Sequence, residues 1–279
     1  MISVDESTLK ALLEEDVGSG DVTSMIVEPC IIDAYIVCKE DAVIAGTEEA
    51  SRIFKLVNCY VTHSIADGSE VKAYTTIMRI NGDARSILAV ERTVLNVMMR
   101  MSGIATYTRR LVSMVKSVNP SVMVAATRKT VPGLRILDKK AVALGGGYTH
   151  RLGLYDMVLI KDNHIALIGS AKDAVRKARS IHGSRYPIEV EVKNLQQAIE
   201  AIQEGADMIM LDNLSSSETE QIIKELISRG LRERVKVEVS GRIDESNIME
   251  YARLNVDYIS VGKITHSVRA VDMSLEVND

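Results

Sequence analysis

Four basic side chains lie beside short apolar runs of the sequence: Arg128, Lys129, Arg151 and Lys161. Such runs are typical of buried strands, and a charge at the end of a buried strand usually serves chemistry. Arginine forks match carboxylate and phosphate oxygens in two-point contacts, whereas lysine supplies a compact charge. Residues 128–164, the basic island, carry a local excess of positive charge although the whole chain has a net charge of −4. We therefore expect a small anionic ligand at these residues.

Two carboxylates and two histidines also lie at or near the ends of short apolar runs: Glu191, Asp212, His150 and His164. Taken singly, Glu191 also fits a solvent-facing strand position, and Lys161 also fits an ion pair with Asp162. Charged side chains that end consecutive buried strands are costly to desolvate unless they pair or bind a ligand. The set as a whole therefore favours a binding site.

Glycines mark three further loops. We expect the run Gly145–Gly147 to let the backbone come close to a ligand. Near the C-terminus, Ser240-Gly241 and Ser260-Val261-Gly262 precede helical patterns. Backbone amides at such turns bind phosphate, and barrels often place a phosphate site after their last strands.

The elements that must position these residues form an alternating pattern after Val118. Seven runs are strand candidates: 122–126, 141–144, 157–160, 188–192, 208–211, 235–239 and 258–261. Helical patterns cover 171–181, 196–204, 217–229 and 245–254. Because ~250 residues and eight strands are typical of a closed (β/α)₈ barrel, the sequence predicts an α/β fold with an open, incomplete barrel of six to seven strands.

The N-terminal part has a different pattern. An amphipathic helix around Leu9 to Leu13 precedes antiparallel β-structure over 31–80, with a helix from Glu48 to Val57. Two helices follow over 85–101, which contains Arg92, and 104–118. We expect an α+β N-terminal domain at 1–107, joined by 268–279, and a barrel domain at 108–267.

Composition excludes several classes of protein. With 279 residues and 46% hydrophobic content the chain can form a full core. Its acidic balance, with a pI near 5.8, argues against nucleic acid or an anionic membrane as partner. Three cysteines without zinc spacing, and no apolar run of the ~20 residues needed to span a bilayer, predict a reduced cytoplasmic protein.

Eight segments, in order along nearly the whole chain, carry a resemblance to a known family: GDVTS (20–24), ERTVLN (91–96), SGIAT (102–106), TRKTVPGLR (127–135), KKAVALGGGYTHRLGLYDMVLIKDNH (139–164), EVEV (189–192), GADMIMLDN (205–213) and DYISVGKITHS (257–267). Together they resemble the quinolinate phosphoribosyltransferases, also called decarboxylating nicotinate-nucleotide pyrophosphorylases. The resemblance implies transfer of phosphoribose from 5-phosphoribosyl-1-pyrophosphate to quinolinate, giving nicotinate mononucleotide, CO₂ and pyrophosphate in NAD biosynthesis.

The resemblance also implies a site, a cofactor and an assembly. The implied substrate-binding residues are Arg92, Thr127, Arg128, Lys129, His150, Arg151, Lys161, Glu191, Asp212, Ser240, Gly241, Arg242, Ser260, Val261 and Gly262. The implied catalytic residues are Lys129, Lys161, Glu191 and Asp212. Mg²⁺ would ride mainly on the pyrophosphate, with Glu191 and Asp212 as further ligands. The chain would form a homodimer or hexamer in which Arg92 reaches a partner subunit's site.

Two departures from the family pattern keep alternatives open. Ala126 stands where the family commonly has Asp, and Arg242 stands where it commonly has Gly or Asn, so a related phosphoribosyltransferase for a different base remains an alternative. Lys161 would also suit a Schiff-base aldolase. His150, His164, Glu191 and Asp212 would suit a metal-dependent hydrolase, and the same charges would suit a non-catalytic anion sensor.

Overall fold

The computed structural model describes residues 2–277, and the chain divides into two units. Unit 1 comprises Met1–Arg109, Thr130–Gly146 and Ile264–Asp279, and unit 2 comprises Arg110–Lys129 and Gly147–Lys263. The sequence analysis placed residues 130–146 with the barrel, whereas in the structure they group with unit 1. We describe each unit by itself.

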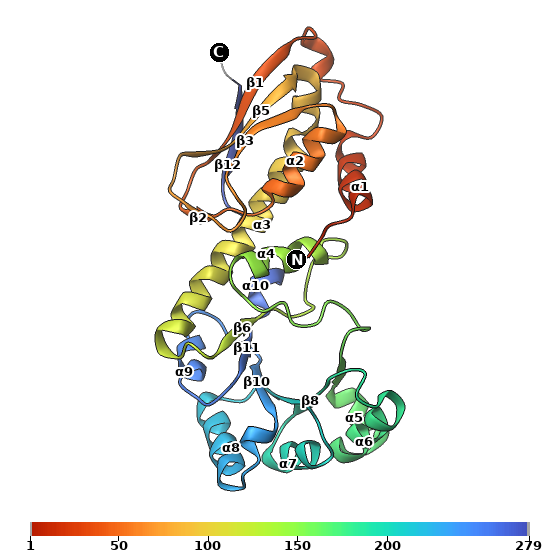
Figure 1. Ribbon diagram of the computed structural model, residues 1–279, viewed down its shortest axis with the longest axis vertical. Coiled ribbons are helices and arrows are strands. Elements are labelled where there is room, and N and C mark those ends of the chain that lie inside the picture. The colour runs from red at the N-terminus through yellow and green to blue at the C-terminus, as the bar shows by residue number, and fades with distance from the viewer. Residues whose placement is uncertain (1, 278–279) are drawn as a thin grey trace. The chain divides into compact units, whose positions relative to one another are not determined.

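Unit 1 contains a four-stranded antiparallel sheet in the order β12-β1-β5-β3 (Figure 1). Its strands are β1 (Ile31–Cys38), β3 (Tyr60–Ser64), β5 (Thr75–Asp83) and β12 (Met273–Val277). Strand β12 runs antiparallel to β1, with Ala34 opposite Val277, which confirms that the C-terminal segment returns to the first domain. Residues 278 and 279 lie outside the described residues.

Smaller elements complete unit 1. They are α1 (Glu6–Val17), the 3₁₀ turn η1 (Ser24–Ile26), α2 (Thr47–Leu56) and a two-stranded sheet of β2 (Ala42–Val43) and β4 (Glu70–Val71). Along β1 the side chains of Ala34, Ile36 and Cys38 are buried, which is the period of two expected for a half-buried strand. Helix α2 buries Ile53 and Phe54, as its apolar spacing predicts.

Helix α3 (Ala84–Val118) is one continuous helix of 35 residues, so the prediction of two helices around Ser102-Gly103 is wrong. The Ser102 hydroxyl accepts a hydrogen bond from the backbone N–H of Ala45 at 3.0 Å. A Cβ atom at Gly103 would lie 2.2 Å from the Arg269 carbonyl oxygen. The two small residues therefore serve close packing within unit 1 rather than a helix break.

Helix α4 (Arg135–Leu144) replaces the strand predicted at 141–144, and that prediction is wrong. Asp138 and Ala141, three residues apart, are both buried, a spacing that shares a face in a helix but falls on opposite faces of a strand. Lys140 pairs with Glu48 at 2.6 Å and with Glu49 at 2.7 Å, all within unit 1. The short apolar run was ambiguous between strand and helix, and these contacts decided it.

Unit 2 is built on a six-stranded, fully parallel sheet in the order β6-β11-β10-β9-β8-β7. Its strands are β6 (Met123–Ala125), β7 (Val158–Ile160), β8 (Ile188–Val192), β9 (Met208–Asp212), β10 (Lys236–Ser240) and β11 (Tyr258–Ser260). The other six predicted strands are confirmed within two residues at each end. The mixed α/β fold with an open barrel of six strands is as expected.

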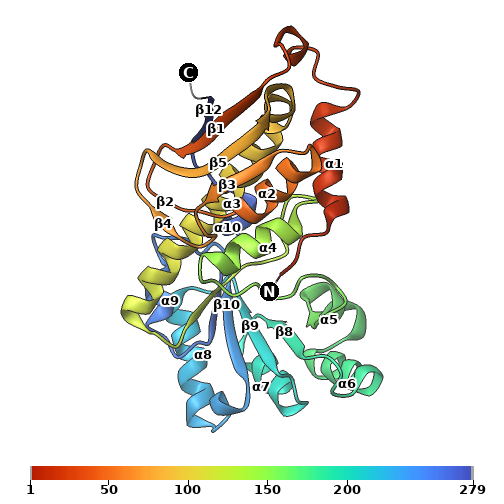
Figure 2. The same ribbon diagram turned by 45° about the horizontal axis from the view of Figure 1, so that its top comes forward.

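Helices follow the strands of unit 2. They are α5 (Asp162–Ile168), α6 (Ala171–His182), α7 (Leu195–Gln203), α8 (Ser216–Ser228), the 3₁₀ turn η2 (Arg232–Arg234) and α9 (Ile248–Ala252), with α10 (Lys263–His266) at the boundary of the units. In α6, α7 and α8 the N-cap side chains of Ser170, Asn194 and Ser215 accept hydrogen bonds from the first turn. Figure 2 shows α6, α7 and α8 outside strands β8, β9 and β10. Among the described residues, no helix combines the length and apolar character needed to cross a bilayer.

Side chains alternate between the two faces of the unit 2 sheet. On β8, Val190 and Val192 are buried on the face that the helices cover, whereas Glu189 and Glu191 point to the opposite, interior face. On β10, Glu238 and Ser240 share that interior face by the same period of two. The sheet therefore has an apolar outer layer and a polar interior that can hold a charged ligand.

Candidate active site

The carboxyl ends of the six parallel strands surround a cavity of about 290 Å³ that lies entirely within unit 2. Ligands of open α/β folds bind at this end of the strands. The cavity is lined by Ala126, Thr127, Arg128, Lys129, His150, Arg151, Leu159, Lys161, Glu191, Met210, Asp212, Glu238, Ser240 and Ser260. The predicted convergence of basic and acidic side chains at one rim is therefore observed.

Two guanidinium groups dominate the basic side of this cavity. The side chain of Arg151 is almost fully buried, and its pKa is lowered first by burial and then by the nearby charge of Arg128. Nε of Arg128 is buried and has no hydrogen-bond partner among the described residues. Two arginines that repel each other, one of them with a buried donor that has no partner among the described residues, are suited to an anion with two acceptor groups.

Lys161 and both arginines also line a second cavity of about 590 Å³ in unit 2, together with Leu159. Its remaining lining is Leu154, Tyr155, Met157, Val158, His164, His182 and Tyr186. The three basic side chains therefore border both cavities, where a flat aromatic anion could contact apolar walls and cations together.

Two carboxylates face the basic groups. Glu191 and Asp212 line the first cavity, and the pKa of Glu191 is raised by burial and by the charge of Asp212. Asp212 accepts a hydrogen bond of 2.5 Å from Nδ2 of Asn213. Two neighbouring carboxylates with oxygen atoms toward a cavity fit Mg²⁺, which prefers oxygen ligands.

The predicted phosphate loops lie after β10 and β11. Gly241 has φ +99°, and a Cβ atom there would lie 2.5 Å from Oδ1 and 2.6 Å from the backbone nitrogen of Asn213. Asp244 pairs with Lys263, which with the Ser246 hydroxyl lowers the pKa of Asp244 to about 2. Ser240 and Ser260 line the cavity. Gly241, Val261 and Gly262 follow these serines in the sequence but are not part of the lining, and Arg242 is exposed to solvent.

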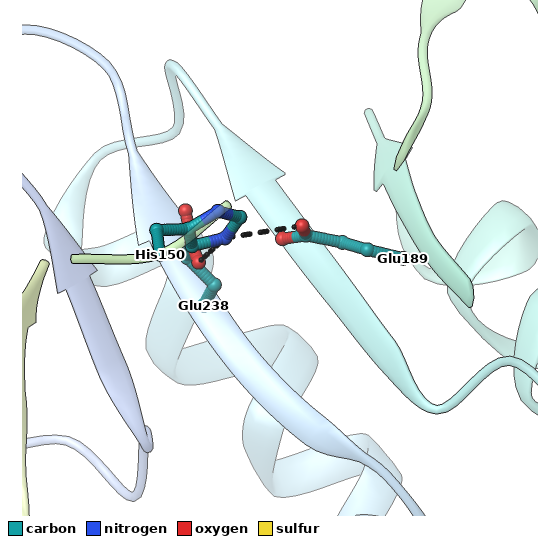
Figure 3. A group of neighbouring side chains, drawn as sticks. All are labelled: His150, Glu189 and Glu238. Carbon is teal, nitrogen blue, oxygen red and sulfur yellow. Dashed lines mark ion pairs between the residues drawn. The ribbon is translucent and has the colours of Figure 1, made fainter. Parts of the chain in front are cut away.

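At the floor of the cavity lies a buried cluster that we call the His–Glu–Glu cluster: His150, Glu189 and Glu238 (Figure 3). His150 and Glu238 are also part of the cavity lining. Nε2 of His150 lies 3.0 Å from Oε2 of Glu238 and 3.2 Å from Oε2 of Glu189. The two glutamate side chains are at most 1% exposed, and their oxygens have no hydrogen-bond partner among the described residues. The contacts with His150 therefore offset the cost of burying the two carboxylates.

Protonation of this cluster follows from its burial. Burial opposes charge on His150, but the two carboxylates outweigh it and raise the pKa of His150 to about 10. Burial and the charge of Glu238 raise the pKa of Glu189 to about 7. Both shifts favour an additional proton in the cluster at neutral pH. The backbone N–H of Arg151 donates to Nδ1 at 2.8 Å, so this proton lies on the side of Nε2 and the carboxylates.

Sequence reasoning missed Glu189 and Glu238, although a signal was present. Glu189 lies two residues before Glu191, and Glu238 lies two residues before Ser240, so each shares the interior face with a residue that was identified. The alternation in EVEV also fits a strand with one face exposed to solvent, which hides this signal. In a strand covered by helices on one face, the alternate polar residues instead line a polar interior.

Several expected contributors lie elsewhere. Arg92 belongs to unit 1, is 58% exposed and contacts Glu91 at 3.9 Å, and it lines neither cavity. Nδ1 of His164 accepts a hydrogen bond from the Lys161 backbone at 3.0 Å. The hydrolase set of His150, His164, Glu191 and Asp212 does not form: within residues 2–277, the one group with metal-binding spacing is the His–Glu–Glu cluster.

Other parts of the basic island serve unit 1. Lys139 and Lys140 are buried there, and Arg135 donates to the Thr130 hydroxyl at 3.1 Å. A Cβ atom at Gly145 would lie 2.6 Å from the Ala105 carbonyl oxygen, so this glycine permits close packing on α3. Gly145 thus has a packing role in unit 1, and the expectation that the run Gly145–Gly147 lets the backbone approach a ligand stays a prediction.

Two family models match the chain over most of its length. The quinolinate phosphoribosyl transferase C-terminal domain matches residues 104–276, and the N-terminal domain of the same name matches residues 21–102. A protein of Methanocaldococcus jannaschii named probable nicotinate-nucleotide pyrophosphorylase (carboxylating) is 48% identical over 273 residues, which are 96% of this chain and 95% of that protein.

Solved structures agree with these matches. The nicotinate-nucleotide pyrophosphorylase of Francisella tularensis superposes with a TM-score of 0.90 at 38% identity, covering 99% of this chain and 98% of that one. The nicotinate-nucleotide pyrophosphorylase of Ehrlichia chaffeensis has a TM-score of 0.92 at 33% identity and covers 100% of both chains.

Proposed function

The chain belongs to the quinolinate phosphoribosyltransferase family, and we propose that the cavity at the carboxyl ends of the unit 2 strands is where it performs the family's reaction. It is a pentosyltransferase of NAD biosynthesis that makes nicotinate mononucleotide, CO₂ and pyrophosphate from quinolinate and 5-phosphoribosyl-1-pyrophosphate. The observation that carries the assignment to this cavity is the meeting of Arg128, Arg151 and Lys161 with Glu191 and Asp212.

Recognition of quinolinate falls to the basic side chains. Arg128 and Arg151 offer two guanidinium forks whose donors match two carboxylates on adjacent ring positions. Lys161 adds a compact charge where the strand β7 ends, beside the apolar wall of Leu159. The unused donor on Arg128 and the repulsion between the arginines support this assignment, because a dicarboxylate relieves both.

Phosphoribosyl pyrophosphate would occupy the other side of the cavity. Ser240 and Ser260 end β10 and β11, and the adjoining turns Gly241–Arg242 and Val261–Gly262 would receive the 5′-phosphate. Glu191 and Asp212 would face the ribose and Mg²⁺. When bound, Mg²⁺ would neutralise charge on the departing pyrophosphate.

The chemistry needs positioning rather than a protein nucleophile. Departure of pyrophosphate gives the ribosyl carbon oxocarbenium character, which Glu191 and Asp212 stabilise electrostatically, while Lys129 and Lys161 offset the leaving charge. The ring nitrogen then bonds to this carbon and becomes positively charged. The bond from ring C2 to its carboxylate breaks, CO₂ leaves, the electron pair stays at C2, and a proton replaces the carboxyl group.

The assembly and location are part of the same proposal. We propose a homodimer or hexamer in which the exposed Arg92 contributes to a partner subunit's site, since within residues 2–277 the one ion contact of its guanidinium is that with Glu91 at 3.9 Å. Cytoplasmic location is supported by three free cysteines at positions 30, 38 and 59, which a reducing compartment preserves.

Incubation with quinolinate, phosphoribosyl pyrophosphate and Mg²⁺ tests the proposal. We expect equal amounts of CO₂ and pyrophosphate, and no pyrophosphate release when nicotinate replaces quinolinate. Turnover of nicotinate or another base at a higher rate would instead identify a transferase of different specificity, the alternative that Ala126 left open.

A further inference from the structure

The two buried glutamates meet at His150 in the interior of the unit 2 sheet, although they stand two residues apart along β9. Glu189 on β8 pairs in register with Met208 of β9, and Glu238 on β10 pairs with Met210 of β9. In α/β barrels, interior layers are filled by side chains from alternate strands, as β8 and β10 are here. Each glutamate lies two residues closer to the strand's amino end than the cavity residue on its strand, Glu191 or Ser240. The two glutamates therefore lie at the floor of the cavity, and Glu238 forms part of its lining.

His150 connects the two glutamates to the substrate side. Its backbone has φ +52°, a left-handed conformation that residues other than glycine adopt at a cost in conformational energy. Its ring is held on one side by Glu189 and Glu238 and on the other by the Arg151 N–H. Such strained residues persist where surrounding contacts over-determine them.

Arg151 is fixed from both directions along the chain. On its N-terminal side stands His150 with the hydrogen bond just described. On its C-terminal side, the backbone N–H of Leu152 donates to Oδ2 of Asp156 at 2.6 Å. The charges of Glu189 and Asp156 act on the pKa of Arg151 in the opposite sense to the charge of Arg128, so they partly offset the repulsion between the two guanidinium groups.

A metal ion does not fit the cluster as well as a proton does. Histidine that binds a metal through Nε2 carries its proton on Nδ1 and donates it. In this chain the Arg151 N–H occupies the lone pair of Nδ1. The contacts of 3.0 and 3.2 Å between Nε2 and the two carboxylates are then contacts across a shared proton.

We propose that Glu189 and Glu238 are positioning residues for quinolinate recognition: they hold the His150 ring, and through it the backbone and guanidinium of Arg151, in the geometry that receives a carboxylate. The inference rests on the proposed function of the cavity. It adds two residues that act through His150 and Arg151, although Glu238 also borders the cavity, and it predicts an effect confined to one substrate.

The test compares variants with different side chains at one position. Glu238→Met removes the carboxylate at similar length, and Glu238→Gln keeps an oxygen that can face Nε2. We expect the Met variant to raise the KM for quinolinate roughly tenfold or more, because misplacing a binding group by about 1 Å can cost on the order of 10²-fold. The KM for phosphoribosyl pyrophosphate should stay within about twofold, and the Gln variant should recover most of the loss. Glu189→Met, measured in the same way, provides an independent second variant if the first does not fold.

Glu49→Gln is the matched control, because Glu49 is also a fully buried carboxylate in an ion pair, with Lys140 at 2.7 Å, but belongs to unit 1. It should lower the Tm without changing either KM. Equal rises in both KM values, no change in the Met variants, or no recovery by Gln would overturn the positioning role. So would stoichiometric metal in the wild-type protein that Glu238→Met loses. A wild-type protein that releases no CO₂ from quinolinate would instead contradict the proposed function itself.

Discussion

The guanidinium of Arg100 makes two hydrogen bonds of 2.8 Å to the carboxylate of Asp138, whose side chain is completely buried in unit 1. This pair joins helices α3 and α4. Burial raises the pKa of Asp138 although Arg100 opposes the shift, so the carboxylate depends on its partner to remain charged.

Asp138→Ala should therefore destabilise the protein strongly. Removing one member of a buried pair leaves the other without compensation, which typically costs about 3–5 kcal/mol of unfolding free energy. Urea unfolding measures it. Glu225→Ala, which breaks an exposed pair with Arg229, is the control and should cost less than about 1 kcal/mol. Similar losses of unfolding free energy in the two variants would show that the buried Arg100–Asp138 pair stabilises the protein no more than an exposed pair does.

Arg128→Ala and Lys161→Ala should lower turnover by orders of magnitude without unfolding the protein. Each removes a cation that the cavity directs at anionic substrate groups, and a charged hydrogen bond is worth about 1.5–3 kcal/mol. Steady-state kinetics and a thermal melt give the two readouts. Lys193→Ala, at an exposed ion pair with Asp162, serves as control and should keep its activity. Near-normal activity of either cavity variant would remove that residue from the mechanism.

Asp212→Asn should raise the Mg²⁺ concentration needed for half-maximal activity. The amide keeps the shape and one oxygen but loses the charge that favours a hard cation. Titration of Mg²⁺ into protein stripped with a chelator measures the shift. An unchanged Mg²⁺ requirement in this variant would mean that the ion is held by substrate alone.

Gly241→Ala should weaken phosphoribosyl pyrophosphate binding more than it lowers stability. The added methyl group would collide with Asn213, and φ +99° also strains any side chain. Gly230→Ala is the matched control: Gly230 also has positive φ, +63°, but nothing lies within 4 Å of its added Cβ. We expect both variants to lose stability, and the rise in KM to appear only in Gly241→Ala.

Stability should fall between pH 4 and pH 2 partly through Asp244. Its pKa is about 2 in the folded protein against an ordinary value of 3.8 for aspartate, so the folded state binds this proton more weakly than the unfolded chain does. The resulting stabilisation is present above the unfolded pKa and is lost as the pH falls toward 2. Unfolding measured across this range in the wild type and in Asp244→Asn should show a smaller decline in the variant. Parallel curves would contradict the assignment.

The sequence by itself determined the parts of the fold that depend on repeating local patterns. The strands β8, β9 and β10 and the helices α6, α7 and α8 follow from apolar periodicity and capping residues, which act within a few neighbours. The residues at the strand ends followed from the same reasoning, because parallel strands place their carboxyl ends at one edge. The sequence therefore predicts Arg128, Lys161, Glu191 and Asp212 as site residues, and all four line the cavity.

Tertiary structure alone decided features that depend on residues distant in the chain. The run Ala141–Leu144 is helical because Asp138 and Lys140 find buried partners on α3 and α2. The continuity of α3 depends on Ala45 and Arg269, far from Ser102-Gly103 in sequence. The cluster of His150, Glu189 and Glu238 exists because a loop and two alternate strands meet inside the barrel. Local sequence preferences cannot specify such meetings, since burial and charge compensation are properties of the folded interior.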